Sequence, residues 1–373
     1  MKVNPSNKTL QISPISQWWP SNQQPLLIAG PCSAETKEQV LQTALRLKKS
    51  NKSALLRAGI WKPRTRPNSF EGVGEIGLEW LAEAKELTGL PTTVEVATAQ
   101  HVELALKHKV DVLWIGARTT VNPFSVQEIA DALKGVSIPV LVKNPVNPDL
   151  QLWLGAIERI MHAGIHSIAA IHRGFSFQGP SIYRNKPMWE IPISLKALHP
   201  EIPIFCDPSH ICGRRDLLLS VAQKAMDLGM TGLMIESHID PDNAWSDAKQ
   251  QITPETLQEL IENLAIRNTS APQDIVDQEL LQYRKEIDYI DEKIIELLGD
   301  RMKIAEAIGE YKKEKNITIL QLDRWKEIMQ TRSEWAKEVG LTDEFTKNYL
   351  EQLHKESIRT QTRVMNSKGD MTI

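Results

Sequence analysis

Eight short apolar segments lie between Leu26 and His238, each ends in a polar or charged residue, and each is followed by a stretch of helix length. LLIAGP (26–31) and VDVLWIGA (110–117) are typical of these segments. The alternation predicts a parallel sheet, and eight units favour an α/β fold closed into a (β/α)8 TIM barrel. In such a barrel the chemistry lies at the C-terminal ends of the strands. The residues at those ends therefore mark the expected rim of an active site: Cys32, Arg57, Glu95, Arg118, Lys143, His172 with Arg173, His210 and Glu236.

The pattern changes abruptly after the barrel. Residues 1–25 form a polar, proline-rich N-terminal arm, residues 26–267 form the expected barrel, and NTSAPQD (268–274) has the composition of a linker. Residues 275–373 are expected to form a small all-α domain with one long helix to about 315 and two shorter helices, at about 321–338 and 343–365. Such a domain cannot easily bury its own apolar stripe, so we expect an intertwined homodimer, or a higher homo-oligomer, through the helical domain.

Composition excludes several classes of partner. The net charge is −3, so no overall positive field favours nucleic acid. There is no run of 18 or more apolar residues to span a membrane, and the polar N-terminus lacks the apolar core of a signal peptide. Three cysteines are too few for a disulfide scaffold and suit a reducing compartment. We therefore expect a cytoplasmic enzyme that acts on small molecules, with no nucleic-acid or membrane partner.

Four residues on the expected rim are of types that bind metal ions: Cys32, His210, Glu236, and Asp247 in the loop after the last strand. A single buried cysteine is usually only a small apolar side chain. Four candidate ligands on one rim favour a shared ion instead. Mixed sulfur, nitrogen and oxygen ligands indicate a divalent transition ion (Mn, Fe, Co or Zn) in preference to Mg or Ca.

Six basic residues lie at or just after the strand ends: Arg57, Lys62, Arg64, Arg118, Lys143 and Arg173. Surface lysines and arginines are usually solvated and carry no function. Six of them on one rim would repel one another unless ligands with several negative charges neutralised them. Because arginine binds carboxylate and phosphate in a bidentate manner, the set predicts a phosphorylated, carboxylate-bearing substrate, or two anionic substrates, beside the metal.

Seven motifs of residues 25–265 resemble, in order, the 3-deoxy-D-arabino-heptulosonate 7-phosphate (DAHP) synthases, and in particular their short, barrel-only branch. The motifs are GPCS (30–33), RAGIWKPRT (57–65), IGART (116–120), VKNP (142–145), HRG (172–174), DPSHICGRRDLLL (207–219) and ESHIDPDNAWSD (236–247). The resemblance implies condensation of phosphoenolpyruvate with erythrose 4-phosphate, the first step toward the aromatic amino acids. It implies that Lys62 is also catalytic.

The resemblance also assigns ligands to the rim. The metal ligands of that family fall on the four candidates above, and its phosphoenolpyruvate contacts fall on Arg57, Lys62, Arg118, Lys143 and Arg173. Its contacts to the aldose phosphate include Arg64 and Thr65. The nearest rival is the related synthase that uses arabinose 5-phosphate, whose counterpart of KPRT is a different, Asn-containing motif. KPRT therefore favours the four-carbon aldose.

Residues 275–365 resemble the all-helical chorismate mutases. Their pattern falls on six residues of this chain: Arg284, Arg301, Lys312, Arg324, Ser357 and Gln361. Arg301 and Lys312 are eleven residues apart, so on one helix they lie within roughly 20° of each other. Arg284 is rotated by about 100° from Arg301, and the resemblance implies that it reaches the partner's site across an intertwined dimer.

The mutase resemblance implies a pericyclic rearrangement of chorismate to prephenate without metal or cofactor. Arg284 from the partner, Arg301 and Arg324 would hold the two carboxylates, and Lys312 and Gln361 would be the catalytic donors to the ether oxygen. Ser357 would complete the chorismate site. Gln321 and Trp325 depart from the family, which often has Asp and Glu at these positions.

The two resemblances together predict a bifunctional enzyme of aromatic amino acid biosynthesis. Fusion by a short linker suggests that chorismate or prephenate, bound at the helical domain, inhibits the barrel. No ACT-like extension is apparent in the sequence. The alternative is a synthase whose helical domain is a non-catalytic module for dimerisation and effector sensing.

Overall fold

The computed structural model describes residues 10–20, 23–49, 54–62, 70–267 and 276–367. The chain divides into two compact units, Met1–Thr269 and Ser270–Ile373, and each is described by itself. Within the described ranges, no helix is both long and apolar enough to cross a membrane.

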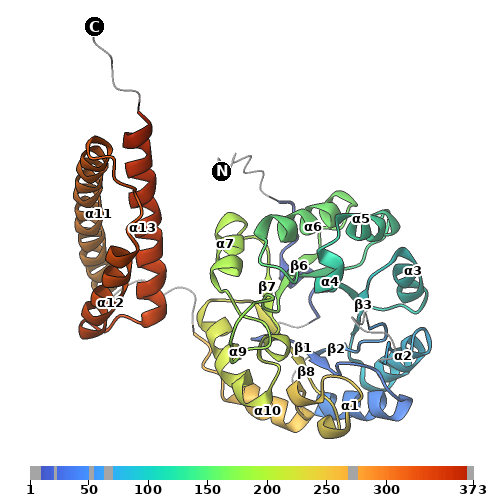
Figure 1. Ribbon diagram of the computed structural model, residues 1–373. Helices are drawn as coiled ribbons and strands as arrows, with labels where there is room; N and C mark the ends of the chain where they lie inside the picture. Colours follow the sequence, from blue (N-terminus) through green and yellow to red (C-terminus); the bar gives the residue numbers. More distant parts are fainter. Residues whose placement is uncertain (1–9, 21–22, 50–53, 63–69, 268–275, 368–373) are drawn as a thin grey trace. The chain divides into compact units, whose positions relative to one another are not determined.

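The first unit is a closed barrel of parallel strands, which confirms the predicted fold (Figure 1). Hydrogen bonds between the first and last strands close it, with Gly30 beside Glu236. The strands are β1 (Leu26–Gly30), β2 (Ala54–Arg57), β3 (Thr92–Val96), β4 (Val112–Ile115), β5 (Val140–Lys143), β6 (Ile168–His172), β7 (Ile204–Cys206) and β8 (Gly232–Glu236).

The longer helices surround the strands on the outside of the barrel (Figure 1). They are α1 (Lys37–Lys49), α2 (Ile76–Thr88), α3 (Ala99–Lys107), α5 (Pro123–Ala132), α6 (Leu150–His162), α7 (Glu190–Leu198), α9 (Leu218–Asp227) and α10 (Pro254–Glu262). Two short helices, α4 (Ala117–Thr120) and α8 (Pro208–Cys212), follow β4 and β7 at the ends of those strands. At the start of α10, the Thr253 side chain accepts a hydrogen bond from the Thr256 amide. The helix ends at Glu262, where Asn263 follows as its C-cap and donates its side-chain amide to the Glu259 carbonyl.

Alternate strand residues belong to two different apolar layers, because successive side chains of a strand point to opposite faces. Ile28, Trp114 and Phe205 belong to the inner layer, within the barrel. Leu27 and Ala29 belong to the outer layer, between strands and helices. Trp19 lies against the Phe205 ring, with 4.9 Å between the ring centroids, so this part of the N-terminal arm packs on the barrel.

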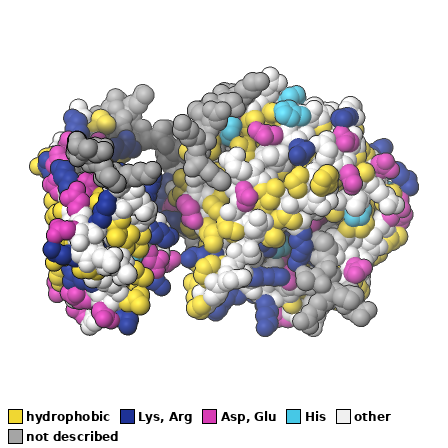
Figure 2. All heavy atoms as spheres, turned by 45° about the horizontal axis from the view of Figure 1, so that its top comes forward, with side chains coloured by type: hydrophobic (Ala, Val, Ile, Leu, Met, Phe, Trp, Pro, Cys, Tyr) yellow, Lys and Arg dark blue, Asp and Glu magenta, His cyan; other side chains and the backbone are white. Residues whose placement is uncertain are grey.

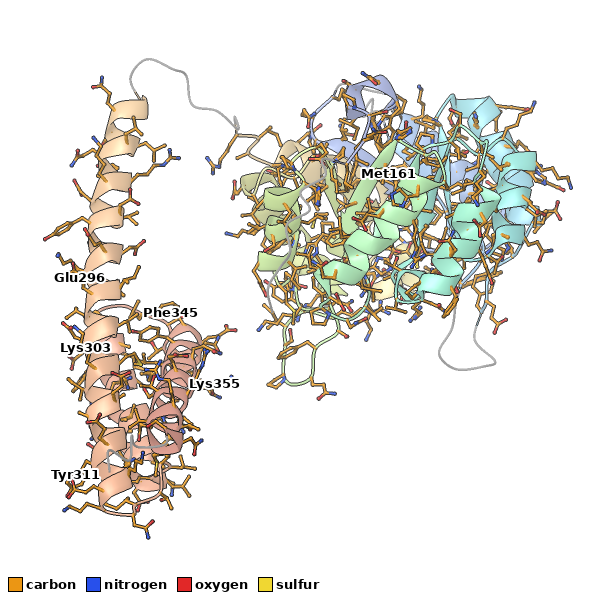
Figure 3. The ribbon with its side chains drawn as sticks, turned by 90° about the horizontal axis from the view of Figure 1, so that it is seen from above. Met161, Glu296, Lys303, Tyr311, Phe345 and Lys355 are labelled. Carbon is orange, nitrogen blue, oxygen red and sulfur yellow. The ribbon has the colours of Figure 1, made fainter. Side chains whose placement is uncertain are left out.

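The second unit consists of α11 (Val276–Glu314), α12 (Leu322–Glu338) and α13 (Asp343–Asn366), which confirms the predicted small all-α region. α13 packs against both other helices. Gly309 permits a close approach of α11 and α13, because a Cβ there would lie 3.2 Å from the Gln361 Cα. On the opposite side of α11, Glu296, Lys303 and Tyr311 point away from α12 and α13 (Figure 3).

The apolar face of α6 packs into the core of the barrel unit. Ile157 on this helix has no exposed surface, whereas Ile193 on α7 is 46% exposed. We expect Ile157→Ala to lower the free energy of unfolding by about 2–5 kcal/mol. Ile193→Ala, the same chemical change at an exposed position, should lower it by less than about 1 kcal/mol. Urea unfolding followed by tryptophan fluorescence measures both, and equal effects would contradict the packing described here.

Candidate active sites

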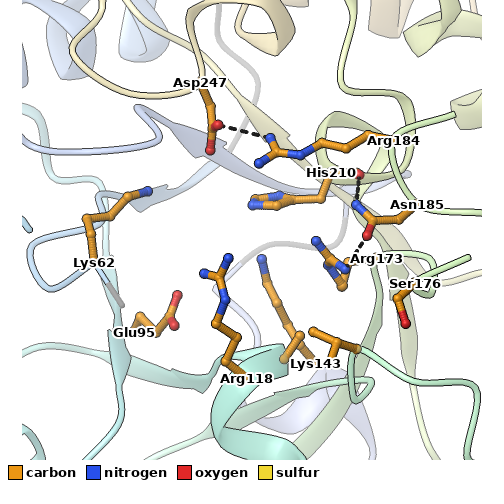
Figure 4. Close-up of a pocket in the computed structure, with 12 residues that line it drawn as sticks. Lys62, Glu95, Arg118, Lys143, Arg173, Ser176, Arg184, Asn185, His210 and Asp247 are labelled. Carbon is orange, nitrogen blue, oxygen red and sulfur yellow. Dashed lines mark hydrogen bonds and ion pairs between the residues drawn. The ribbon is translucent and has the colours of Figure 1, made fainter. Parts of the chain in front are cut away.

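A polar cavity of about 270 Å³ opens at the C-terminal ends of the barrel strands. Lys and Arg side chains, in dark blue, gather around a hollow on this face of the barrel (Figure 2). Figure 4 shows the interior of the cavity. Its lining residues are Lys62, Glu95, Ala117, Arg118, Lys143, Val146, Arg173, Ser176, Arg184, Asn185, His210 and Asp247.

The strands deliver the predicted cations to this rim. Arg57 ends β2, Lys143 ends β5, and Arg173 directly follows β6. Arg118 lies on the short helix α4, which begins just after β4. Lys62, Arg118, Lys143 and Arg173 line the same cavity. Arg64 and Thr65 lie outside the described residues.

Arg57 and Lys143 are almost completely buried, and each has an acidic partner. The Arg57 Nη2 atom lies 3.2 Å from Glu236 Oε1, and the Lys143 Nζ atom lies 2.8 Å from Asp207 Oδ2. Such partners are required because an isolated buried charge is very costly. Arg57 Nε and Nη1 are buried and donate no hydrogen bond. These two donors fit an anionic ligand, since an unsatisfied buried guanidinium is destabilising.

Asp207 is a central carboxylate that sequence reasoning missed. It follows β7 directly, and its Oδ2 atom contacts both Lys143 Nζ and His210 Nδ1, each at 2.8 Å. Burial opposes its ionisation, but His210 and Lys143 hold the pKa of Asp207 well below its usual value. The ionised carboxylate therefore holds one predicted anion-binding lysine and orients one predicted metal ligand. The available signal was its position inside the DPSH motif.

The four predicted metal ligands lie on one rim as two pairs. Cys32 Sγ lies 3.4 Å from Asp247 Oδ2, and His210 Nε2 lies 3.8 Å from Glu236 Oε1. Lys62 Nζ donates a hydrogen bond of 2.8 Å to Cys32 Sγ. Among the described residues, no three His, Cys, Asp or Glu side chains gather closely enough to hold a metal ion. A single shared ion therefore stays a prediction.

The chemistry of these donors nevertheless fits a divalent transition ion. Burial, with the nearby carboxylate of Glu236, raises the pKa of the Cys32 thiol to about 12, so only a strong local positive charge would make it a thiolate. Glu236 Oε1 is buried and accepts no hydrogen bond. The pKa of Asp247 is lowered to about 2, against the effect of burial, chiefly by Arg184. Glu236 Oε1 thus has ion-pair contacts with Arg57 and His210 but accepts no hydrogen bond, and the Asp247 carboxylate is ionised.

Glu95, Arg184 and Asn185 line the cavity but were given no role from the sequence. Glu95 accepts a hydrogen bond from the Trp114 indole at 3.1 Å. The close approach of the Glu95 carboxylate is permitted by Gly116, because a Cβ at that position would collide with it. The sequence pattern had already marked Glu95 as a strand end, and β3 ends one residue later, at Val96. Arg184 and Asn185 lie in the loop between β6 and α7, where no strand or helix pattern marks them.

In the helical unit, α11 and α13 bring four predicted residues into one region. Arg301 Nη1 donates to Ser357 Oγ at 2.6 Å, and Lys312 Nζ donates to the Ile319 carbonyl at 2.6 Å. Gln361 is buried, and its Oε1 atom has no hydrogen-bond partner. Burial lowers the pKa of both Arg301 and Lys312. These side chains form a partly desolvated polar patch that fits an anionic ligand.

Arg284 and Arg324 differ from these four. Both are exposed, and Arg324 pairs with Glu327 at 2.6 Å. Trp325, one of the two departures from the family pattern, stacks on His354 with 4.0 Å between ring centroids. The pKa of His354 is lowered by burial and by the positive charges of Arg301 and Lys312. The aromatic pair therefore borders the polar patch.

The sequence model of the DAHP synthetase I family matches residues 15–269, and that of the chorismate mutase type II family matches residues 283–362. Phospho-2-dehydro-3-deoxyheptonate aldolase from Thermotoga maritima is 33% identical over 238 residues, covering 64% of this chain and 68% of the relative. 2-Dehydro-3-deoxyphosphooctonate aldolase from Brucella ovis is 28% identical over 283 residues, covering 69% of this chain and 95% of the relative.

The solved structures agree with the sequence matches. The crystal structure of the Thermotoga maritima phospho-2-dehydro-3-deoxyheptonate aldolase (DAHP synthase) has a TM-score of 0.58 and 32% identity, and the match covers 64% of this chain and 67% of that chain. A truncated form of the Thermotoga maritima synthase has a TM-score of 0.55 and 29% identity, covering 64% of this chain and 84% of its own. Both predicted family assignments, a synthase and a mutase, are thus confirmed: the chain belongs to the DAHP synthetase I family and carries a chorismate mutase type II region that follows the barrel in the sequence.

Proposed function

We propose that the barrel cavity condenses phosphoenolpyruvate with erythrose 4-phosphate to form DAHP. The observation that carries the proposal is the convergence of Lys62, Arg118, Lys143 and Arg173 on the cavity that His210 also lines. Four cations suit two phosphorylated substrates, one of which also carries a carboxylate. Arg57 adds two buried donors that have no hydrogen-bond partner among the described residues.

These residues bind and orient the reactants. Arg57, Lys62, Arg118, Lys143 and Arg173 hold phosphoenolpyruvate by its phosphate and carboxylate. The methylene carbon of its enol forms a bond with the aldehyde carbon of erythrose 4-phosphate as the C=O π bond opens, and the aldehyde oxygen takes up a proton to become a hydroxyl. Water adds to the carbon that bears the phosphate and releases one proton, which balances the proton taken up. Phosphate then leaves that carbon by C–O cleavage with the remaining proton of the added water, and a ketone is left. Holding both anions in register supplies much of the rate.

Lys62 is the catalytic candidate of this set. Its Nζ atom donates both to the Cys32 carbonyl at 3.0 Å and to Cys32 Sγ at 2.8 Å, so the ammonium group is held at the edge of the cavity. A fixed positive charge there stabilises negative charge that develops on the aldehyde oxygen. Cys32, His210, Glu236 and Asp247 would hold a divalent transition ion (Mn, Fe, Co or Zn), which would polarise that oxygen as a Lewis acid.

The alternative aldose is arabinose 5-phosphate, because relatives named for the eight-carbon product also match the barrel. KPRT favours the four-carbon aldose, with Arg64 and Thr65 as contacts to erythrose 4-phosphate. Turnover of phosphoenolpyruvate with each aldose separates the two proposals. Product formed with arabinose 5-phosphate and none with erythrose 4-phosphate would favour the rival.

Cys32→Ala tests the metal assignment. We expect the variant to lose metal-dependent DAHP formation, because one of four ligands and its thiolate charge are removed. Co²⁺ titration followed by the thiolate-to-metal absorption band measures binding directly, and the band should be absent. Since the Cys32 thiol must release a proton to bind, wild-type affinity should rise with pH between about pH 6 and pH 8. Cys206→Ala, a buried cysteine of β7, is the matched control. Full activity of Cys32→Ala would refute the assignment.

We also propose that the helical unit rearranges chorismate to prephenate. Arg301 and Arg324, with Arg284 of the partner, would hold the two carboxylates. Lys312 and Gln361 would donate to the ether oxygen as its bond to carbon breaks, with Gln361 doing so through its amide. Ser357 already anchors the Arg301 side chain. No group needs to form a covalent bond to the substrate.

Loss of chorismate absorbance in the full-length protein is the test of this activity. We expect Arg301→Ala to lower kcat/KM by about a hundredfold or more, because a charged donor to the substrate disappears. Arg359→Ala, at an exposed position on α13, should leave turnover unchanged. Absence of turnover in the wild-type protein would favour the alternative, a non-catalytic module for dimerisation and effector sensing.

The helical unit is further proposed to form a homodimer, or a higher homo-oligomer, through α11. This helix exposes a series of large apolar side chains to solvent: Leu280, Leu281, Ile287, Ile290, Ile294, Ile295, Leu297, Ile304 and Ile308. Pairing with a second copy of α11 would cover them, as in other long-helix pairs. It would also bring the exposed Arg284 to the site of a partner.

Chorismate or prephenate bound at the helical unit is proposed to inhibit the barrel. We expect either compound to slow DAHP formation by the wild-type protein, and Arg301→Ala to remove this inhibition while retaining uninhibited DAHP formation. The reason is that Arg301 would bind the effector but lies outside the barrel. Initial rates with rising effector concentration measure the effect. Unchanged inhibition in Arg301→Ala would place the effector site elsewhere.

A further inference from the structure

Arg184 and Asn185 are adjacent in the loop between β6 and α7, and both line the barrel cavity (Figure 4). Neither has a role in the proposed function. The loop is held in place by its backbone, because the Arg184 and Asn185 amides donate to the Cys212 and Ile211 carbonyls at 3.3 and 3.1 Å. The backbone that carries both side chains is therefore fixed at the rim.

Asn185 connects the anion-binding side of the cavity to the metal-binding side. Its Oδ1 atom accepts a hydrogen bond of 2.8 Å from Arg173 Nη1, and its Nδ2 atom donates one of 2.6 Å to the His210 carbonyl. Asn185 is only 9% exposed, so these bonds are shielded from water. One amide thus sets the orientation of the Arg173 guanidinium relative to the backbone of His210.

Arg184 contacts Asp247 of the proposed metal site directly and is linked to Glu236 through Gln250. Its Nη1 atom lies 2.9 Å from Asp247 Oδ1 and 2.7 Å from Gln250 Oε1. Gln250 in turn donates from Nε2 to Glu236 Oε2 at 2.6 Å. Asp247 has a left-handed backbone conformation, with φ of +48°, so it depends on its surroundings to stay in place. Arg184 supplies that support.

We propose that Arg184 and Asn185 form a positioning bridge that couples anion binding at Arg173 to metal binding at His210, Glu236 and Asp247. This inference rests on the proposed synthase function. Binding of the first ligand restricts the motion of Arg184 and Asn185. The second ligand therefore loses less conformational entropy of these side chains when it binds. The coupling is reciprocal: phosphoenolpyruvate strengthens metal binding by the same factor as the metal strengthens phosphoenolpyruvate binding.

The test measures binding in the full-length protein without an aldose, so that no turnover occurs. Co²⁺ affinity is determined by absorbance, with and without phosphoenolpyruvate. In the wild-type protein we expect phosphoenolpyruvate to tighten Co²⁺ binding by about fivefold or more. In Asn185→Ala, Co²⁺ binding alone should weaken by about tenfold, and the tightening should fall below about twofold.

Arg184→Met provides a second, independent variant, which keeps the length of the side chain and removes its charge. It should also weaken Co²⁺ binding by about tenfold, through loss of support for Asp247 and Gln250. Arg214→Met is the matched control, because Arg214 is an exposed arginine whose partner Asp216 is also exposed. The control should keep both the affinity and the coupling. Circular dichroism and melting curves check that each variant is folded.

The outcomes separate the bridge from the synthase function. If the wild-type protein binds Co²⁺ and phosphoenolpyruvate with strong coupling, but both variants retain the full affinity and coupling, the bridge is wrong and the synthase function stands. Binding of both ligands without coupling in the wild-type protein overturns the bridge as well. If the wild-type protein binds neither ligand, the proposed function fails and the bridge fails with it. Loss of coupling in the folded variants alone supports the bridge.

Discussion

The contact of Asp207 with both Lys143 and His210 is the interaction on which the rest of the barrel site depends. A charged lysine that is 4% exposed needs an acidic partner, and Asp207 lies 2.8 Å from it. The same carboxylate oxygen holds His210 by Nδ1, so Nε2 is left to face Glu236. One buried carboxylate therefore fixes a predicted anion-binding group and a candidate metal ligand with respect to each other.

The neighbouring ion pair extends this arrangement around the barrel. Glu236 ends β8 and lies beside Gly30 of β1, while its carboxylate contacts Arg57 of β2. Glycine is required at position 30, where φ is +140° and a Cβ would collide with the Arg57 carbonyl. The strand that closes the barrel, β8, therefore also carries the carboxylate that pairs with the buried Arg57. The charged groups of the rim are thus held in place by contacts within the fold itself.

The helical unit differs from the barrel in how much apolar surface it buries. The barrel buries its apolar surface within one chain, whereas α11 leaves Ile287, Ile290 and Ile294 largely exposed. Its polar patch is built where α11 meets α13, and Gly309 sets how closely the two helices approach. Lys312 and Gln361 are both buried, and the side-chain oxygen of Gln361 has no hydrogen-bond partner. The polar groups of this patch are thus partly shielded from water. Charges interact more strongly in such an environment, so an anionic ligand would be attracted more strongly there than at an exposed surface.

The sequence by itself determined the elements, their order and the chemical types at the strand ends, because these depend on local periodicity. The β/α alternation, the cations Arg118, Lys143 and Arg173, and the long helix were all readable in this way. Only the tertiary structure decided which side chains contact one another in the site. Asp207 lies in a recognised motif, yet its double contact depends on β5 and β7 in three dimensions. Asn185 has no periodic signal at all, because it acts from a loop whose place is set by contacts far away in the chain. Local pattern encodes which side chains reach the rim, whereas packing decides how they are held there.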